Sequence, residues 1–431
     1  MSTSDLVALG GFGALFAMML LRVPIGIAMA LTGVGGFAAI AGWGPALNLL
    51  AISPVRTVTD FSLGLIPMFV LMGVLATASG MSKELFRAGH AWLGRFRGGL
   101  ALATIGACGG FAAICGSSVA TAATMSNIAF PEMRRFGYRD DIATGVIAAG
   151  GTLGILIPPS VVLAVYGFIT EQDIGRLFIA GIVPGLLAVG LYMLTVRIAY
   201  GRALPPGAPT GWAERFGSLR GIWAVMLLFV LIIGGIYMGV VTPTEAAAAG
   251  AVLTGLIGLA RRRLDGRALI ACLIEALRTS VAIFTILIGA LLFGYFLAIT
   301  QTPQKITGLL VALELGRYGT LALILILFLL MGCVLDAMAM IILLVPIVFP
   351  VIQTLGFDPI WFGVIVVMTV ELGLITPPVG MNVFVINSII PEVNLFAVFR
   401  GVAPFILTDL FRLALLVAFP WLVLFLPRTM G

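Results

Sequence analysis

The stretches GILIPPS, residues 154–160, and GLITPPV, residues 373–379, each place a proline pair inside a long apolar segment. Proline has no backbone N–H and its ring collides with the preceding helical turn, so a pair of prolines interrupts a helix. The 431-residue chain is 61% apolar and 10% charged, with a mean hydropathy of +1.19. This composition is typical of a polytopic membrane protein, in which each span needs about 20 apolar residues. We therefore expect roughly ten to twelve spans, two of them interrupted.

The two proline pairs belong to an internal repeat, because 377 − 158 = 219 and the same offset holds on both sides of them. A fixed period of this kind indicates two copies of one structural unit. The matched positions are mainly glycines and prolines: Gly137 with Gly356, Gly154 with Gly373 and, at an offset of 220, Gly181 with Gly401 and Pro184 with Pro404. The repeats are therefore expected to share a backbone geometry.

Loop charge indicates how the two copies are oriented. MRRFGYRDD, residues 133–141, contains three arginines, whereas its counterpart IQTLGFDP, residues 352–359, contains neither Lys nor Arg. Lys and Arg gather in short cytoplasmic loops, so equivalent loops of the two copies lie on opposite sides of the membrane. The predicted fold class is an all-α polytopic membrane protein of two inverted repeats, an architecture typical of secondary transporters.

Each repeat is also expected to contain a re-entrant helical hairpin. Residues 99–131 form an apolar segment between two basic clusters, and this segment is too short for two spans. A hairpin with Gly116, Ser117 and Ser118 at its tip fits the length, provided that protein or a water-filled cavity covers the tip. Because 117 + 219 = 336, the same register places Asp336 at the tip of a second hairpin.

The broken helices and the tips are candidate binding positions. Unwound backbone frees carbonyl groups for a cation, and the helix that resumes after the break presents free N–H groups to an anion. The alternative is that each proline pair only kinks a packed helix. An acid inside a membrane segment, such as Asp336, usually binds an ion or faces a cavity, but it can also be a solvated turn residue. Two roles remain open for Glu371, tuning a cation site or satisfying hairpin N–H groups.

Several longer motifs carry a resemblance to a known family: RVPIGIAMAL (22–31), LIPMFVLMGVLATASGM (65–81), GGTLGILIPPSVVLAVYG (150–167), GVVTPTEAAAAGA (239–251), MGCVLDAMAMIILLVPIVFP (331–350) and ELGLITPPVGMNVFVI (371–386). Together they resemble the large membrane (M) subunit of tripartite ATP-independent periplasmic (TRAP) transporters, of the ion transporter superfamily. The resemblance extends almost from end to end.

The resemblance implies a sodium-coupled importer of an organic acid in the bacterial inner membrane. A periplasmic substrate-binding protein would deliver the substrate, and a small four-helix membrane subunit (Q type) would pack on this chain. Na⁺ would be the coupling ion, with no organic cofactor, and transport would follow an elevator mechanism. The alternative is a stand-alone ion-coupled anion exchanger or antiporter of the same fold, and the organic acid is left open.

The resemblance also implies a division into a moving transport part and a scaffold. Scaffold helices and a first arm helix are expected in 1–98, the first transport half in 99–170 (hairpin 99–131, broken helix 140–170), and scaffold helices, a cytoplasmic linker (201–218) and a second arm in 171–318. The second transport half is expected in 319–391 (hairpin 319–355, broken helix 359–391), and a C-terminal scaffold helix in 392–431.

Site residues are transferred motif by motif. The first sodium site would comprise Gly116, Ser117, Ser118, Thr152, Gly154, Pro158 and Pro159, and the second Asp336, Gly373, Thr376, Pro377 and Gly380. Substrate would contact Ser118, Thr121, Asn127, Ser160 and Asn382. Against these roles, Ser and Thr in membrane helices often bond their own i−4 carbonyl, and Asn382 could cap a helix.

Enzymatic chemistry has no candidate residues in this sequence. His90 is the single histidine and lies outside the expected spans, so a Ser–His pair is excluded. The sequence contains neither HExxH nor GxxxxGK[ST], the patterns of metalloproteases and P-loop nucleotide hydrolases. We therefore expect a transporter and not an enzyme.

Overall fold

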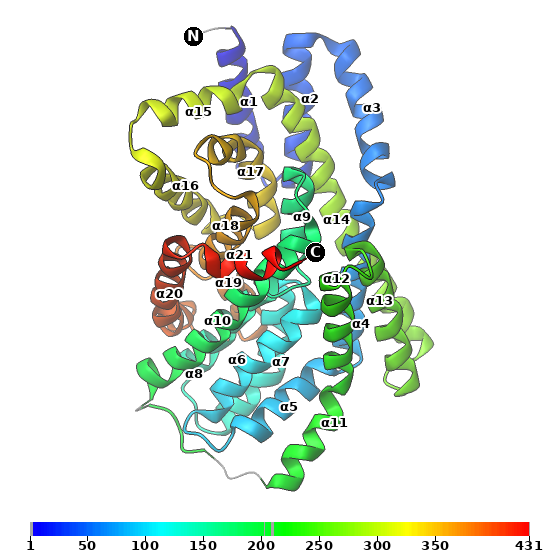
Figure 1. Ribbon diagram of the computed structural model, residues 1–431, viewed down its shortest axis with the longest axis vertical. Coiled ribbons are helices and arrows are strands. Elements are labelled where there is room, and N and C mark those ends of the chain that lie inside the picture. Colours follow the sequence, from blue (N-terminus) through cyan, green and yellow to red (C-terminus); the bar gives the residue numbers. More distant parts are fainter. Residues whose placement is uncertain (1–2, 202, 208–210, 431) are drawn as a thin grey trace.

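Every element assigned in residues 3–201, 203–207 and 211–430, the part of the chain that this computed structural model describes, is a helix (Figure 1). A helix pairs its backbone N–H and C=O groups within one segment, which a bilayer core without water requires. The predicted all-α polytopic class is confirmed.

The N-terminal part of the chain forms apolar helices that end in an amphipathic arm. They are α1 (Thr3–Leu20), α2 (Ile25–Ala41), α3 (Trp43–Thr59), η1 (Ser62–Gly64), α4 (Leu65–Ala78) and the arm helix α5 (Met81–Leu93). The α3 segment and the η1–α4 segment are bent by 62° relative to each other.

The first repeat contains a helical hairpin followed by a broken helix. The hairpin is α6 (Gly99–Cys115) and α7 (Ser118–Arg135), and the broken helix is α8 (Asp140–Leu156) and α9 (Val161–Thr170), followed by α10 (Ile174–Tyr200). The hairpin extends four residues beyond the expected end at 131, because Arg134 and Arg135 form its last turn before Gly137 adopts a left-handed backbone.

The helices between the repeats are α11 (Trp212–Phe229), the π-helical segment η2 (Val230–Gly234), α12 (Gly235–Tyr237), α13 (Pro243–Ala260), α14 (Gly266–Ile299) and the second arm α15 (Thr302–Ala312). α14 runs along α2 with the two backbones in close contact. A Cβ on Gly26 would lie 2.7 Å from the carbonyl oxygen of Thr285, and one on Gly33 would lie 2.6 Å from the carbonyl carbon of Leu292. Small residues allow such close helix packing in a membrane protein.

The second repeat has the same order of elements. Its hairpin is α16 (Gly316–Gly332) and α17 (Ala337–Thr354), its broken helix is α18 (Pro359–Gly373) and α19 (Met381–Ile389), and α20 (Leu395–Ala418) and α21 (Trp421–Arg428) follow. α16 begins three residues before the expected start at 319, because Gly316 takes a left-handed conformation that starts the helix.

Eight helices of the described residues are long and apolar enough to cross a membrane, or nine if the bent pair formed by α3 and α4 is one span. Four shorter apolar helices accompany them: α2, α6, α16 and α18. The sequence estimate of ten to twelve exceeds the eight or nine long spans and reaches twelve only when the four shorter helices are added to the eight. Composition alone does not separate short hairpin arms from full spans. α6 and α16, each of 17 residues, are the first arms of the two hairpins.

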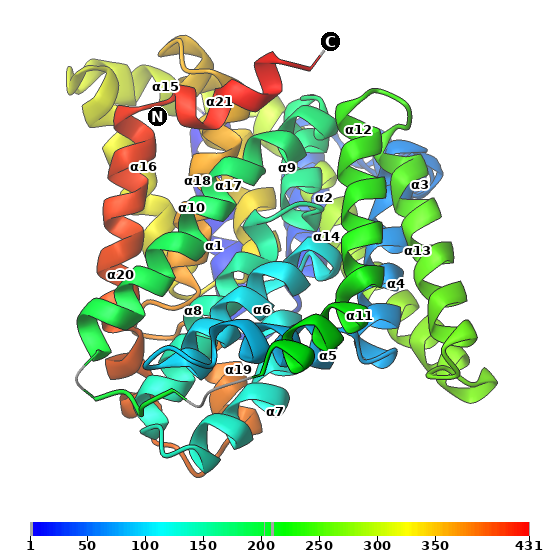
Figure 2. The same cartoon turned by 60° about the horizontal axis from the view of Figure 1, so that its bottom comes forward.

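The two hairpins enter the molecule from opposite ends. Figures 1 and 2 both place α5 and α7 in the lower half and α15 and α17 in the upper half. Loop charge predicts this opposition, since equivalent loops of inverted repeats lie on opposite sides.

α10 and α20 pack against the broken helices of the repeats. α10 contacts α6, α8, α9 and α18, and α20 contacts α8, α18 and α19. The sequence-based division counted residues 171–200 and 392–431 with the scaffold, whereas the packing groups α10 and α20 with α8 and α18. Which helices move together stays a prediction.

Single cysteines at equivalent loop positions test the inversion. Arg134 and Gln353 are exposed at the ends of α7 and α17, and the four native cysteines are buried. We expect Arg134→Cys to react with a membrane-impermeant thiol reagent from the cytoplasmic side and Gln353→Cys from the opposite side, measured on intact cells and on inverted vesicles. Reaction of both from one side would contradict the inversion.

Candidate functional site

The tips of the two hairpins border one cavity of about 620 Å³. Tip one contributes Gly116, Ser117 and Ser118, and tip two contributes Asp336. The opposite wall comes from α4 and α14, and includes Gly73, Thr77, Glu275, Thr279 and Ile283. The cavity therefore lies where the two repeats meet the scaffold helices.

The first tip is a tight helix–turn–helix. Gly116 ends α6 with a φ of 63°, a left-handed conformation that glycine adopts without steric cost. Ser117 caps α7, because its Oγ accepts from the backbone N–H of Ala120 at 3.3 Å. A Cβ on Gly116 would lie 2.8 Å from the carbonyl oxygen of Pro159, so glycine lets the tip approach the first break.

The first break separates α8 from α9 at two prolines joined by a cis peptide bond, Pro158 and Pro159. Ser160 caps α9 by accepting from the N–H of Leu163 at 3.2 Å, and its hydroxyl donates to the carbonyl of Ile155. A Cβ on Gly154 would lie 2.5 Å from the carbonyl oxygen of Ser117. Of the residues predicted for the first sodium site, Gly116 and Ser117 of the tip therefore lie against Pro159 and Gly154 of the broken helix.

The second tip is capped by an acid. One carboxylate oxygen of Asp336 accepts from the N–H groups of Met338 at 2.8 Å and Ala339 at 3.1 Å. Asp336 and Ser117 are thus equivalent by register and both cap the second helix of their hairpin. The side chain of Asp336 is half-buried at the cavity, so a cap and a cation ligand are compatible roles for it.

The second break runs from the end of α18 at Gly373 to Gly380, whose φ of 62° precedes α19, and it includes the cis bond between Pro377 and Pro378. A Cβ on Gly373 would lie 2.7 Å from the Cα of Gly332, so this break packs on the second hairpin. The Thr376 hydroxyl donates to the carbonyl of Leu372 at 2.6 Å. Leu374 of this break borders the cavity.

One hydrogen bond joins the first tip to the second broken helix. Ser118 Oγ donates to Asn382 Oδ1 at 2.7 Å, and the buried amide nitrogen of Asn382 has no partner among the described residues. Thr121 instead donates to the Ser117 carbonyl at 2.8 Å, the i−4 bond anticipated for it. Asn127 is exposed on α7 and donates to Ala123, so the structure does not bring it to the cavity.

Four helix N-termini border the cavity. The first residues of α7, α9, α17 and α19 all line it: Ser118, Val161, Ala337 and Met381. Each N-terminus carries roughly half a positive charge, which suits a carboxylate. Ser117, Ser160 and Asp336 already accept from some of the first-turn N–H groups of α7, α9 and α17. Within the described chain, Asp336 and Glu275 are the charged side chains that line the cavity, so a cation has oxygen ligands there as well.

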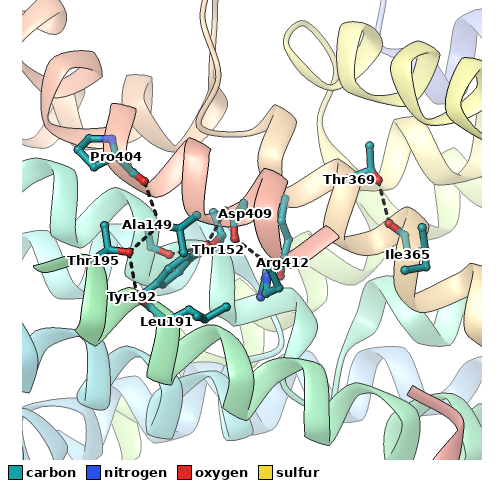
Figure 3. Close-up of polar contacts among 12 residues, drawn as sticks. Ala149, Thr152, Leu191, Tyr192, Thr195, Ile365, Thr369, Pro404, Asp409 and Arg412 are labelled. Carbon is teal, nitrogen blue, oxygen red and sulfur yellow. Dashed lines mark hydrogen bonds and ion pairs between the residues drawn. The ribbon is translucent and has the colours of Figure 1, made fainter. Parts of the chain in front are cut away.

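Thr152 and Glu371 lie in a separate buried cluster, of which Figure 3 labels Thr152, Tyr192, Asp409 and Arg412. Thr152 contacts Tyr192, and Glu371 contacts Arg412, which also pairs with Asp409. Sequence reasoning considered Thr152 and Glu371 but missed Tyr192, Asp409 and Arg412. The sequence does contain a signal for two of them. Asp409 and Arg412 are opposite charges three positions apart within the apolar segment that forms α20.

A model of the family described as "Tripartite ATP-independent periplasmic transporter, DctM component" matches residues 12–422. Curated proteins are similar over nearly their whole length. The chain is 39% identical to the C4-dicarboxylate TRAP transporter large permease protein DctM of Pseudomonas aeruginosa, covering 93% of this chain and 94% of the relative. It is 32% identical to the sialic acid TRAP transporter large permease protein SiaM of Vibrio cholerae (97% of each chain) and 33% identical to the ectoine/5-hydroxyectoine TRAP transporter large permease protein UehC of Ruegeria pomeroyi (96% and 97%).

Among solved structures, the YdaH transporter of Alcanivorax borkumensis is similar with a TM-score of 0.64 at 16% sequence identity. The match covers 88% of this chain and 90% of that chain. At this identity the likeness concerns the fold alone.

The caps at Asp336 and Asp358 provide a stability test. Asp358 caps α18 with the same geometry, since one oxygen accepts from the N–H groups of Ile360 and Trp361, but it lies away from the cavity. We expect Asp336→Ala and Asp358→Ala each to lower stability by about 1 kcal/mol, and Asp336→Asn to lower it by less, because Asn also caps helices. Thermal unfolding of the purified chain in sodium-free detergent measures this. An unchanged melting temperature for Asp336→Ala would contradict the cap.

Proposed function

This chain belongs to the DctM component family of tripartite ATP-independent periplasmic transporters, and from that premise we propose that it imports an organic acid across the bacterial inner membrane in symport with Na⁺. The family assigns it to the large permease component of a transport system, not to an enzyme. The observation that carries the proposal is the convergence, on one cavity, of both tips and of the chain beside both breaks, represented by Ile155 and Val161 and by Leu374 and Met381.

For sodium, the proposal rests on the oxygen atoms of the two breaks. In the first repeat the candidate ligands are the carbonyls and hydroxyls around Gly116, Ser117 and Pro159, which are in contact. In the second they are the Asp336 carboxylate and the backbone from Thr376 to Gly380. Sodium is a hard cation that prefers such oxygen donors. We leave Thr152 out of the first set because its hydroxyl is engaged with Ala149 and Tyr192.

For the substrate, the proposal rests on the four helix N-termini around the cavity and on the Ser118–Asn382 pair. N–H groups at helix starts bind carboxylates without a basic side chain. The similar permeases are named for C4-dicarboxylates, sialic acid and ectoine, all of which contain a carboxylate. An organic acid is the substrate class with which all of these observations agree.

Movement of the site is proposed to follow an elevator. The hairpins, the broken helices, α10 and α20 would slide as one body along α1–α4, α13 and α14, carried by the arms α5 and α15. The cavity supports this, because it lies between the tips and the scaffold residues of α4 and α14. A small membrane subunit would fix the scaffold, and a periplasmic substrate-binding protein would deliver the substrate.

Reconstitution tests the function. Proteoliposomes that contain this chain and its small subunit are assayed for uptake of labelled C4-dicarboxylates, sialic acid and ectoine, with the binding protein and an inward sodium gradient added in turn. We expect uptake of one substrate class only when both are present. Uptake that persists without the binding protein would instead support a stand-alone exchanger, and uptake without sodium would contradict symport.

The charge of Asp336 is tested separately from its capping role. Asp336→Asn keeps a cap but removes the negative charge, so we expect the sodium concentration for half-maximal uptake to rise by about tenfold or more, since one lost charge-assisted contact is worth roughly 1.5–3 kcal/mol. Asp358→Asn is the matched control and should leave this concentration unchanged. Equal behaviour of the two variants would remove Asp336 from the second sodium site.

A further inference from the structure

The arms α5 and α15 leave the scaffold through equivalent turns. Gly80 directly precedes α5 and Gln301 directly precedes α15, and the two positions are equivalent because 301 − 80 = 221. Both have a left-handed backbone, with a φ of 77° at Gly80 and 56° at Gln301. A side chain makes this conformation unfavourable, so the surrounding structure must impose it at Gln301. Each arm therefore begins at a defined corner.

The fourth residue of each arm is charged and pairs with a scaffold helix. Glu84 of α5 and Lys305 of α15 are equivalent (305 − 84 = 221) and have opposite charge. Glu84 pairs with Arg261 and Arg263 at the end of α13, and Lys305 pairs with Asp5 in the first turn of α1. The repeats thus keep the place of the charge and exchange its sign.

The pair on the first arm is largely shielded from solvent, with 13% of the Glu84 side chain exposed. Its Oε2 lies 2.7 Å from Nη1 of Arg261, and its Oε1 lies 3.5 Å from Nη2 of Arg263. Arg261 also donates to the carbonyl oxygens of Arg220 and Gly221 on α11, at 3.4 Å each. Partial burial strengthens an ion pair relative to an exposed one. The start of α5 is therefore held between α11 and α13.

The pair on the second arm joins α15 to the first helix of the chain. Lys305 Nζ lies 2.6 Å from Oδ1 of Asp5 and donates to the hydroxyl of Ser4 at 3.2 Å. The two arms lie at opposite ends of the molecule in Figures 1 and 2. The scaffold is therefore tied to one arm at each end.

The contacts between α5 and the first hairpin are apolar instead. A Cβ on Gly89 of α5 would lie 3.0 Å from the carbonyl oxygen of Ala103 of α6, and one on Gly110 of α6 would lie 3.0 Å from Cδ2 of Leu85. Within the described chain, the ion pairs of α5 run to α13 and not to α6. Apolar contacts are non-directional, so they allow a shift that paired charges resist.

We propose that each arm is a lever pinned to the scaffold at its fourth residue. The Glu84 pin and the Lys305 pin persist through the transport cycle, while the other end of each arm follows its hairpin. This inference rests on the elevator movement proposed above. A left-handed glycine supplies the joint at each moving end, Gly98 with a φ of 75° before α6 and Gly316 with a φ of 70° at the start of α16.

A disulfide in place of the first pin tests whether it persists. A Cβ on Gly221 would lie 3.3 Å from the Cβ of Glu84, close to the separation of about 3.5–4.5 Å in a disulfide. The double variant Glu84→Cys/Gly221→Cys therefore lacks the ion pair when reduced and has a covalent pin when oxidised. We expect sodium-driven uptake in proteoliposomes to fall in the reduced form and to recover on oxidation. Loss of uptake on oxidation overturns the proposal.

The matched control links the moving end of the same arm to the same scaffold helix. Trp92 of α5 and Phe216 of α11 are exposed and in contact, with ring centres 6.2 Å apart. We expect Trp92→Cys/Phe216→Cys to transport when reduced and to stop once a short bifunctional thiol reagent joins the two positions. Undiminished uptake in the joined form would show that this end does not move, and it too would overturn the lever. The unsubstituted chain, with four buried cysteines, receives the same treatments.

Electron paramagnetic resonance tests the second pin without relying on transport. Spin labels are attached through Leu6→Cys and Gln304→Cys, exposed positions beside Asp5 and Lys305. Lys305→Asp should broaden the distribution of distances between the labels, because two acids then face each other. Exchanging the charges, Asp5→Lys with Lys305→Asp, should narrow it again. A distribution that Lys305→Asp leaves unchanged refutes this pin. Failure of the unsubstituted chain to transport would count against the proposed function alone, since these distances do not depend on uptake.

Discussion

Backbone polar groups at membrane depth must find partners inside the protein, and the rest of this structure depends on how that requirement is met at four interruptions. Each hairpin tip ends one helix and caps the next, with Ser117 in one repeat and Asp336 in the other. Each break packs on a hairpin backbone through a glycine, Gly154 or Gly373. The interruptions thus cover one another, and the space left between them is the cavity.

The two repeats share this backbone but differ in charge. The first cap is a hydroxyl and the second a carboxylate, and behind the breaks the pair formed by Thr152 and Tyr192 corresponds to the pair formed by Glu371 and Arg412. Symmetry therefore fixes where polar groups are placed, while the sequence of each copy decides whether the group at a position is neutral or charged.

The fold was largely accessible from the sequence because its determinants are local. Proline pairs, loop arginines and glycines at a fixed offset predicted the breaks, the inverted repeat and the hairpins to within a few residues. The cluster around Arg412 was not predicted, since its contacts join residues up to 217 positions apart and depend on the packing of α10 and α20. Likewise, the side of α7 on which Asn127 lies could not be predicted, because it depends on the rotation of the helix about its axis, which composition does not specify.

The four helix N-termini around the cavity have a consequence for evolution. The partial positive charge of a helix N-terminus comes from the backbone and is independent of side-chain identity, so substitutions in the wall do not abolish it. It also lacks the directional pairing of an arginine with one particular acid. A cavity of this design can accommodate acids of different shape after changes to a few wall residues, while the backbone that borders it stays the same.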